Sequence, residues 1–285
     1  MKKQIRYSET YIHNKSTTDK ALTVLKGIIE GVISDQALND LEYTTIKNWI
    51  DNYSFLQGNA GVHSVFESLY SALEDGVFTV EECKDILWAI DKCSTTFYDD
   101  ITQRCQELHG LLIGIAADRV ILSSELSYLW TWLNDNEVLK GLFPYDEIYS
   151  LIMQIGHQKT LSQQEKDFLI QACSWTENKS ISTSCPLIPW EVDPMITFKG
   201  KTFCITGGSK RGPRAKIIEE IVERGGKVVT GISKSLGYLV VCEEANVAWT
   251  HATYGRKIEG VIMHRRNGST TALICEADLW DALNV

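Results

Sequence analysis

Residues 198–208 read FKGKTFCITGG, and this stretch decides the expected fold of the last third of the chain. The segment TFCIT has the length and residue types of a buried strand, and it stops at two glycines. Pro213 and the helical spacing of RAKIIEEIVE follow, so we expect a tight turn and then a helix. A threonine hydroxyl and open backbone N–H groups beside a helix N-terminus suit an anion.

Further strands and helices are predicted to the end of the chain. Gly225 and Gly226 end the first helix, and KVVTGI and LGYLVVC are strand-like. A helix is expected from about Gly255, then a strand in TALIC and a helix in EADLWDAL. The order β-α-β-β-α-β-α predicts a small α/β domain with a four-stranded parallel sheet over residues 198–285.

The preceding sequence repeats itself at an offset of 83 residues: GVISDQALNDLEYTTIKNWIDN begins at Gly31 and GIAADRVILSSELSYLWTWLND at Gly114. Each half is doubled internally, with a turn, a polar N-cap and a Glu three positions later. We therefore expect an all-α domain of helical hairpins over residues 21–176. Residues 1–20 are predicted to be a flexible tail, and the Pro- and Ser-containing residues 177–197 a linker.

Acidic turns of this kind raise the alternative of a metal site. An EF-hand loop needs oxygen ligands at alternating positions, whereas apolar residues follow Asp35 and Asp118. Helix capping therefore explains the acidic residues better. In the third copy Leu122 replaces the polar cap, so we expect Ser123 to cap that helix instead. The turns resemble those of the tellurite-resistance TerB-like domains, a family linked to metal sensing, but no metal site is carried over.

The charge is divided unevenly along the chain. The formal net charge is −9, but residues 196–285 hold 13 basic and 9 acidic residues, whereas residues 1–195 hold 15 and 28. The result is a mildly basic module joined to an acidic one. The 8 cysteines form no C-x-x-C pair, and no window is apolar enough for a signal core or membrane span. We expect a cytoplasmic protein with no membrane contact, metal or cofactor.

Motifs for common catalytic centres are also missing. The sequence has no K-x-D-G nucleophile motif of nucleotidyltransferases, and no Walker A, G-x-S-x-G or H-E-x-x-H motif. We therefore predict no catalytic residue and a protein that is not an enzyme.

The C-terminal pattern GKTFCITGG…IIEEIVERGGKVV…SKSLGYLVV…GRKIEG…ALICEADLWDAL resembles a BRCT domain, of the kind found in NAD-dependent DNA ligases and replication-factor-C large subunits. In members that bind phosphate, a Ser/Thr hydroxyl, the next Gly N–H and a Lys of the second helix hold it. The resemblance places these roles on Thr206, Gly207 and Lys257. The alternative is that Thr206 only caps a turn and Lys257 is a solvated surface charge. Candidate contacts to the DNA backbone are Lys210, Arg211, Arg214 and Arg256.

Two functions of different classes follow. In the first, the chain is a non-catalytic binder whose BRCT domain recognises a phosphate on a DNA end or nick, or on a phosphorylated protein, while the acidic helical domain engages an unknown protein. In the second, it is a protein–protein adaptor with no DNA contact. The basic C-terminal third favours the first function, and the acidic majority of the chain favours the second.

Overall fold

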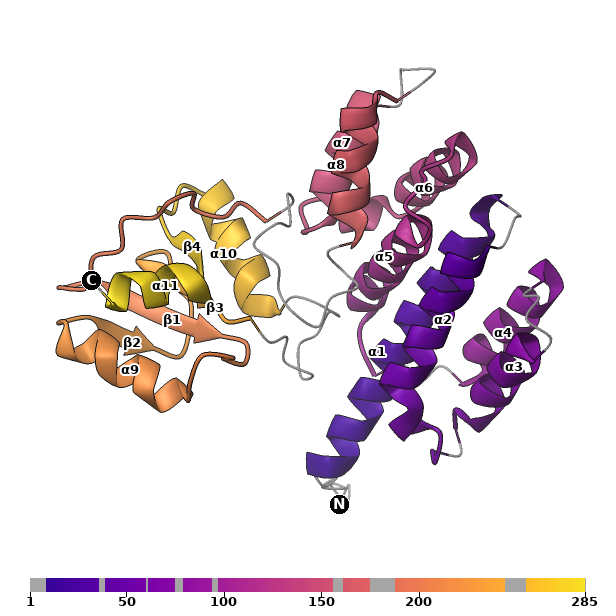
Figure 1. Ribbon diagram of the computed structural model, residues 1–285, viewed down its shortest axis with the longest axis horizontal. Helices are drawn as coiled ribbons and strands as arrows, with labels where there is room; N and C mark the ends of the chain where they lie inside the picture. The colour runs from indigo at the N-terminus through magenta and orange to yellow at the C-terminus, as the bar shows by residue number, and fades with distance from the viewer. Residues whose placement is uncertain are drawn as a thin grey trace, which may run out of the picture. The chain divides into compact units, whose positions relative to one another are not determined.

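The structure, a computed structural model, describes residues 9–35, 39–59, 61–74, 79–93, 97–155, 161–174, 188–243 and 255–284. The chain divides into two compact units: residues 1–140 with 148–176, and residues 141–147 with 177–285. The described part of the first unit is helical, and the second contains a parallel sheet (Figure 1). The predicted fold class, an all-α domain followed by a small α/β domain, is therefore confirmed.

The helical part follows the repeat in the sequence. Helices α2 and α6 begin at Asp40 and Ser123, and α4 and α8 begin at Val80 and Gln163, so both pairs keep the 83-residue offset. The helices are α1 (Glu9–Val32), α2 (Asp40–Tyr53), α3 (His63–Leu73), α4 (Val80–Cys93), α5 (Asp100–Ala116), α6 (Ser123–Asp135), α7 (Tyr145–Ile155) and α8 (Gln163–Ser174). None of the described helices is long and apolar enough to cross a membrane.

Helix α1 starts earlier than expected. It begins at Glu9, and Thr17, Thr18, Asp19 and Lys20 are buried, so the prediction of a flexible tail is wrong from residue 9 onward. The polar sequence suggested a solvated segment, but its polar groups find partners inside the domain. The Tyr98 N–H donates to the Asp19 carboxylate at 3.4 Å, and the Asn59 side-chain amide donates to the Thr18 hydroxyl at 3.4 Å. Burial lowers the pKa of Lys20 to about 8.

Glycines bring α1 and α5 into backbone contact along their length (Figure 1). A Cβ atom at Gly27 would lie 2.1 Å from the carbonyl oxygen of Glu107, and one at Gly110 would lie 2.0 Å from that of Val24. Gly27 and Gly110 are themselves equivalent positions of the repeat, as are Gly31 and Gly114. The close approach of the two helices therefore depends on glycines that the repeat supplies twice.

The repeated glutamates cap helices. In each copy of the unit a Glu carboxylate accepts the backbone N–H of the N-cap residue three positions earlier. These pairs are Glu42 with Asn39 (2.9 Å), Glu82 with Thr79 (2.8 Å), Glu125 with Leu122 (2.6 Å) and Glu165 with Ser162 (2.8 Å). The third copy thus keeps half of the capping box at Leu122, and the expectation that Ser123 caps α6 is wrong. The geometry supports a structural role for these acidic residues.

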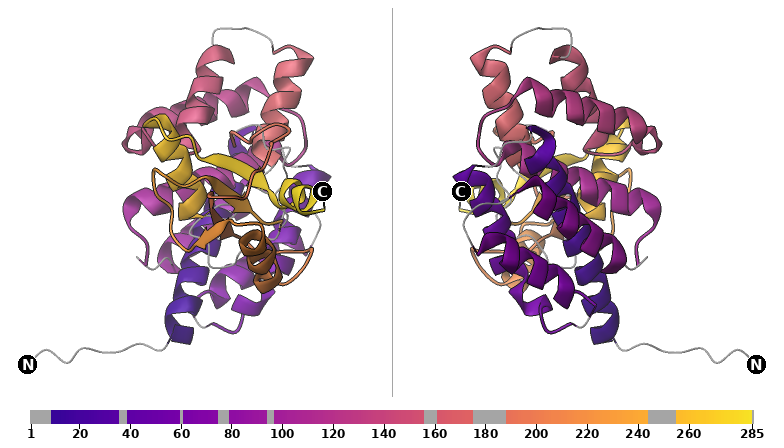
Figure 2. Two further views of the ribbon diagram at one scale, coloured as in Figure 1. Left: turned by 90° about the vertical axis from the view of Figure 1, so that its left-hand side faces the viewer. Right: turned by 90° about the vertical axis from the view of Figure 1, so that its right-hand side faces the viewer.

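The second unit contains a sheet in the order β2-β1-β3-β4 with all strands parallel. On one face Phe203 and Ile205 of β1 pack against Ile217 and Ile221 of α9 and Leu279 of α11. Figures 1 and 2 show α10 on the opposite face. The elements are β1 (Thr202–Thr206), α9 (Arg214–Glu223), β2 (Lys227–Val229), β3 (Tyr238–Val241), α10 (Arg256–Arg266), β4 (Ala272–Cys275) and α11 (Glu276–Leu283).

The predicted linker is only partly described, since residues 177–187 lie outside the described residues. From residue 188 onward the chain belongs to the second domain. The N–H of Glu191 donates to the carbonyl of Leu273 in β4 at 2.9 Å, and Ile188 is buried. This part of the expected linker therefore runs against the sheet as part of the domain.

We expect Gly110→Ala to destabilise the helical domain, because its new methyl group would meet the backbone of α1. Forcing an extra carbon into a packed interface costs about 1–3 kcal/mol. The midpoint of urea unfolding of the full chain measures this loss. Gly58→Ala is the matched control, because a Cβ there meets nothing within 4 Å. Equal midpoints for the two variants would show that the glycine contact does not determine stability.

We also expect the stability of the helical domain to depend on the protonation of Glu30. Burial, and then the neighbouring Glu107, raise the pKa of Glu30 to about 8, against the opposing effect of Lys26. The folded state then binds this proton more tightly than the unfolded state, so stability falls as pH rises from the ordinary value of 4.5 through the raised one. Glu30→Gln should remove part of that fall in urea unfolding. A variant with the same pH profile as the wild type would contradict the prediction.

Candidate phosphate-binding site

The candidate site lies at the C-terminal ends of β1 and β3. After β1 the chain crosses to β2 on one side, and β3 pairs on the other side of β1, so the strand order reverses between β1 and β3. Thr206 ends β1 opposite Val241 at the end of β3. Ligands of open α/β sheets bind at such a switch point, beyond the carboxyl ends of the strands. Gly207 turns the chain away there with a φ of 87°, a conformation that favours glycine.

Thr206, Gly207 and Lys257 lie at this same strand end. Thr206 is 6% exposed, and its carbonyl accepts the N–H of Cys242 at 2.8 Å. Lys257, in the first turn of α10, places its Nζ 3.4 Å from the carbonyl oxygen of Ile205, the residue before Thr206. Within the part of the chain that the structure describes, the Thr206 hydroxyl and the Gly207 N–H have no hydrogen-bond partner. Thr206 and Gly207 therefore end β1, and the Lys257 ammonium group contacts the carbonyl of the residue just before them.

The four basic candidates differ in their surroundings. Arg214 is turned back onto the site, where its guanidinium donates to the carbonyl of Gly207 at 2.7 Å. Arg211 instead forms an ion pair with Glu243 at 3.3 Å. Lys210 and Arg256 are exposed, and Arg256 begins α10 directly before Lys257. Arg214 therefore contacts one of the predicted phosphate-binding residues, while Arg211 has an acidic partner.

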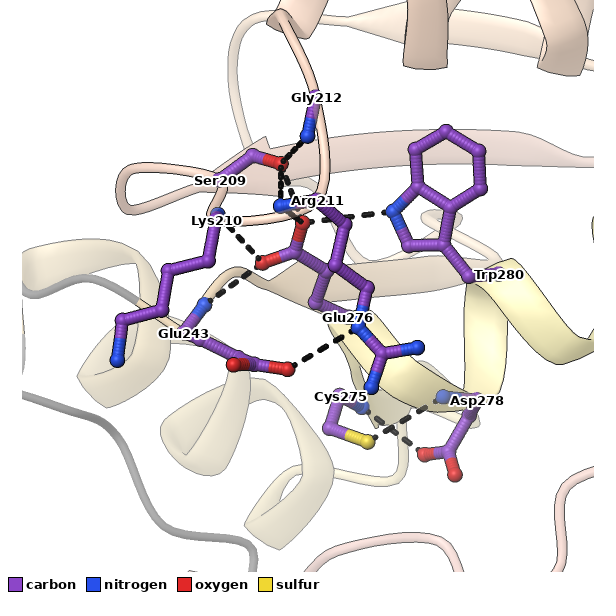
Figure 3. Close-up of polar contacts among 9 residues, drawn as sticks. All are labelled: Ser209, Lys210, Arg211, Gly212, Glu243, Cys275, Glu276, Asp278 and Trp280. Atoms are coloured by element: carbon purple, nitrogen blue, oxygen red, sulfur yellow. Dashed lines mark hydrogen bonds and ion pairs between the residues drawn. The ribbon is translucent and has the colours of Figure 1, made fainter.

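Sequence reasoning missed the residue that organises the loop after β1. Glu276, the first residue of α11, is completely buried and lies under the loop of residues 209–212 (Figure 3). Its Oε1 accepts the Ser209 hydroxyl, the Arg211 N–H at 3.3 Å and the Trp280 indole N–H at 3.4 Å. Its Oε2 accepts the N–H groups of Lys210 at 3.3 Å and Glu243 at 3.0 Å. The carboxylate thus joins the ends of β1 and β3 to α11.

These hydrogen bonds keep Glu276 ionised despite its burial. Burial raises the pKa of the carboxyl, but the bonds from the Glu243 N–H, the Ser209 hydroxyl and the N–H groups of Arg211 and Lys210 lower it more. The pKa of Glu276 therefore lies below its ordinary value of 4.5. In the sequence, an acidic residue directly after a buried strand was the available signal, but a Glu in the first turn of a helix is also explained by the helix dipole.

We expect this carboxylate to contribute to stability in a pH-dependent way. Its folded-state pKa is depressed, so its contribution is fully present above the ordinary value of 4.5 and is lost as pH falls through the folded-state pKa. The difference in urea midpoint between wild type and Glu276→Gln should therefore shrink as the solution is acidified below pH 4.5. The exposed Glu219→Gln serves as the control. A gap that stays constant with pH would contradict the ionised, hydrogen-bonded state.

Comparison with known proteins identifies the second domain. Residues 193–282 match the family model of the BRCA1 C Terminus (BRCT) domain, as the resemblance implied. No curated protein and no solved structure matches the chain. The match spans the described strands and helices of the sheet domain, including Thr206, Gly207, Lys257 and Glu276. BRCT domains are generally non-catalytic modules that bind phosphate groups or proteins, and residues 193–282 of this chain form a BRCT domain.

Proposed function

We propose that this protein is a non-catalytic binding protein whose BRCT domain holds the 5′-phosphate of a DNA end or nick at Thr206, Gly207 and Lys257. The observation that carries the proposal is the position of the Lys257 ammonium group, 3.4 Å from the carbonyl oxygen of Ile205 at the end of β1. That contact is long and to a neutral oxygen, so the cation can exchange it for a phosphate oxygen.

The chemistry of the strand end supports a phosphate monoester. A terminal phosphate carries two negative charges near neutral pH and accepts several hydrogen bonds. The Thr206 hydroxyl and the Gly207 N–H supply neutral donors, and Lys257 supplies a charge-assisted one. A glycine also leaves no side chain over its own N–H, which lets the phosphate approach the backbone. Arg214, fixed on the Gly207 carbonyl, adds positive charge at the same place.

The charge of the C-terminal third favours DNA over a phosphorylated protein as the source of this phosphate. Residues 196–285 hold 13 basic and 9 acidic residues, and Lys210 and Arg256 are exposed near the site. A DNA strand brings further phosphates beyond the terminal one, and each can neutralise such a residue. The small basic excess predicts weak, salt-sensitive binding. If the ligand were instead a phosphorylated protein, the chain would bind a phosphopeptide but not DNA.

We further propose that the helical domain engages a protein partner. Residues 1–195 hold 28 acidic against 15 basic residues, a balance that repels DNA and attracts basic protein surfaces. Two large aromatic side chains of this domain are mostly exposed, Phe55 at 64% and Trp88 at 65%. Aromatic residues of this kind often anchor protein–protein contacts.

The second candidate function is a protein–protein adaptor that does not contact DNA. The net charge of −9 for the whole chain favours it, because long-range repulsion then opposes the approach of DNA. The salt dependence of any DNA binding separates the two functions, since release of counterions makes it steep.

We expect the full chain to bind a labelled DNA duplex with a recessed 5′-phosphate more tightly than the same duplex ending in a hydroxyl. Fluorescence anisotropy at about 50 mM and about 200 mM salt measures both affinities and the salt slope. Lys257→Glu should weaken binding of the phosphorylated duplex about tenfold or more, because it replaces a charge-assisted bond by repulsion.

Lys227→Glu is the matched control for this experiment. It makes the same change of charge in the same domain, but Lys227 begins β2 and therefore lies at the opposite end of the sheet from Thr206. It should change general DNA affinity slightly and leave the preference for a 5′-phosphate intact. DNA affinity that changes neither with the 5′-phosphate nor with the Lys257 substitution would contradict the proposed site. Absence of DNA binding at low salt would favour the adaptor function.

A further inference from the structure

Two sets of hydrogen-bond donors lie at the end of β1 and in the loop that follows it. We call the Ser209 hydroxyl and the N–H groups of Lys210 and Arg211 the inner donors, because they bind Glu276. The Thr206 hydroxyl and the Gly207 N–H are the outer donors. The N–H groups of Lys210 and Arg211 and the Ser209 hydroxyl all point to the buried carboxylate of Glu276 (Figure 3). Gly208 separates these donors from Gly207, whose N–H has no partner among the described residues. The Thr206 hydroxyl and the Gly207 N–H belong to buried residues at the strand end and are not bound by Glu276, whereas the Ser209 hydroxyl and the N–H groups of Lys210 and Arg211 are bound by it.

Further contacts close the loop around this carboxylate. The Ser209 hydroxyl oxygen also accepts the N–H groups of Gly212 at 3.2 Å and Arg211 at 3.3 Å. From the other end of the loop, Arg214 donates to the carbonyl of Gly207 at 2.7 Å. The N–H of Glu243, which also binds Glu276, follows Cys242, the donor to the Thr206 carbonyl. Glu276 thus binds both the loop after β1 and the end of β3, at Glu243.

We propose that Glu276 is a positioning residue for the phosphate site. It does not touch the phosphate; it binds the donors of residues 209–211 and the N–H of Glu243, and so fixes the backbone of the loop that follows Thr206 and Gly207. The inference rests on the proposed function for the identity of the ligand, but the positioning of the loop can be measured without any ligand.

The negative charge of Glu276 has an effect that opposes this role. A buried negative charge near the site repels a phosphate, so its removal would strengthen phosphate binding if repulsion were the larger effect. However, the carboxylate is surrounded by N–H and hydroxyl donors, and these dipoles oppose its field toward the site. Loss of the carboxylate would leave several buried donors without an acceptor. We therefore expect removal of the Glu276 carboxylate to weaken phosphate binding.

Glu276→Gln is the sharpest test because it keeps the size of the side chain. The carboxamide offers an oxygen at one position only, and its NH₂ group then faces N–H or hydroxyl donors. Asp278→Asn is the matched control: it neutralises another carboxylate of the first turn of α11, but that side chain binds the N–H of Cys275 at 3.0 Å rather than the loop. Ser209→Ala and Ser209→Thr form a second pair, since threonine keeps the hydroxyl.

Amide hydrogen exchange of the ligand-free full chain should show the effect on the loop. In Glu276→Gln the peptide that covers residues 208–213 should exchange about tenfold faster than in wild type, while peptides from α10 change little. Asp278→Asn should leave the loop peptide unchanged. Unchanged loop exchange in Glu276→Gln would overturn the inference whatever the binding results are.

Binding to the 5′-phosphorylated and the unphosphorylated duplex then tests the consequence. Glu276→Gln and Ser209→Ala should lose about tenfold in affinity for the phosphorylated duplex, and Ser209→Thr should recover most of it. Tighter binding by Glu276→Gln would show that repulsion dominates and would overturn the inference. If wild type binds the phosphorylated and the unphosphorylated duplex with equal affinity, the proposed function is wrong. The exchange experiment still decides whether Glu276 positions the loop.

Discussion

A carboxylate enclosed by protein must be matched by hydrogen-bond donors, and in the BRCT domain this requirement links segments that are far apart in the sequence. Glu276 is fully buried, and its oxygens accept donors from the loop after β1, from the end of β3 and from Trp280 of its own helix. Any change in one of these segments alters the partners of the other two. The geometry of the strand ends, and hence of the proposed phosphate site, therefore depends on this one ionised side chain.

The helical domain is held together by a different constraint, the close approach of two helix backbones. Gly27 and Gly31 of α1 face Gly110 and Gly114 of α5, and a Cβ at any of them would overlap the opposite helix. The glutamates of the repeated turns, such as Glu42 and Glu125, satisfy the N-cap N–H groups of the helices that follow. Part of the acidic character of this domain thus has a structural origin at its turns.

Much of the fold could be predicted because its signals are local. Strand length, the glycines after Thr206 and helical spacing are all read within a few residues, and the succession of strands and helices along the chain follows from them. Glu276 could not be found in this way, because its partners Ser209 and Arg211 lie 67 and 65 residues away in the sequence. Nor does the sequence distinguish Arg211 of the loop, which pairs with Glu243, from Arg214 at the start of α9, which binds the Gly207 carbonyl. The resemblance of the helical repeat to TerB-like domains stays a hypothesis.

The central claim is that a phosphate binds the outer donors of the loop after β1 while Glu276 occupies the inner ones. The most direct measurement is an NMR titration of the isotope-labelled full chain with a 5′-phosphorylated duplex, compared with the same duplex ending in a hydroxyl. The account predicts phosphate-specific shifts of the amide signals of Gly207 and Lys257, with those of Arg211 and Glu243 nearly unmoved. Large phosphate-specific shifts at Arg211 and Glu243 with none at Gly207 would contradict it, because the phosphate would then have displaced the Glu276 carboxylate.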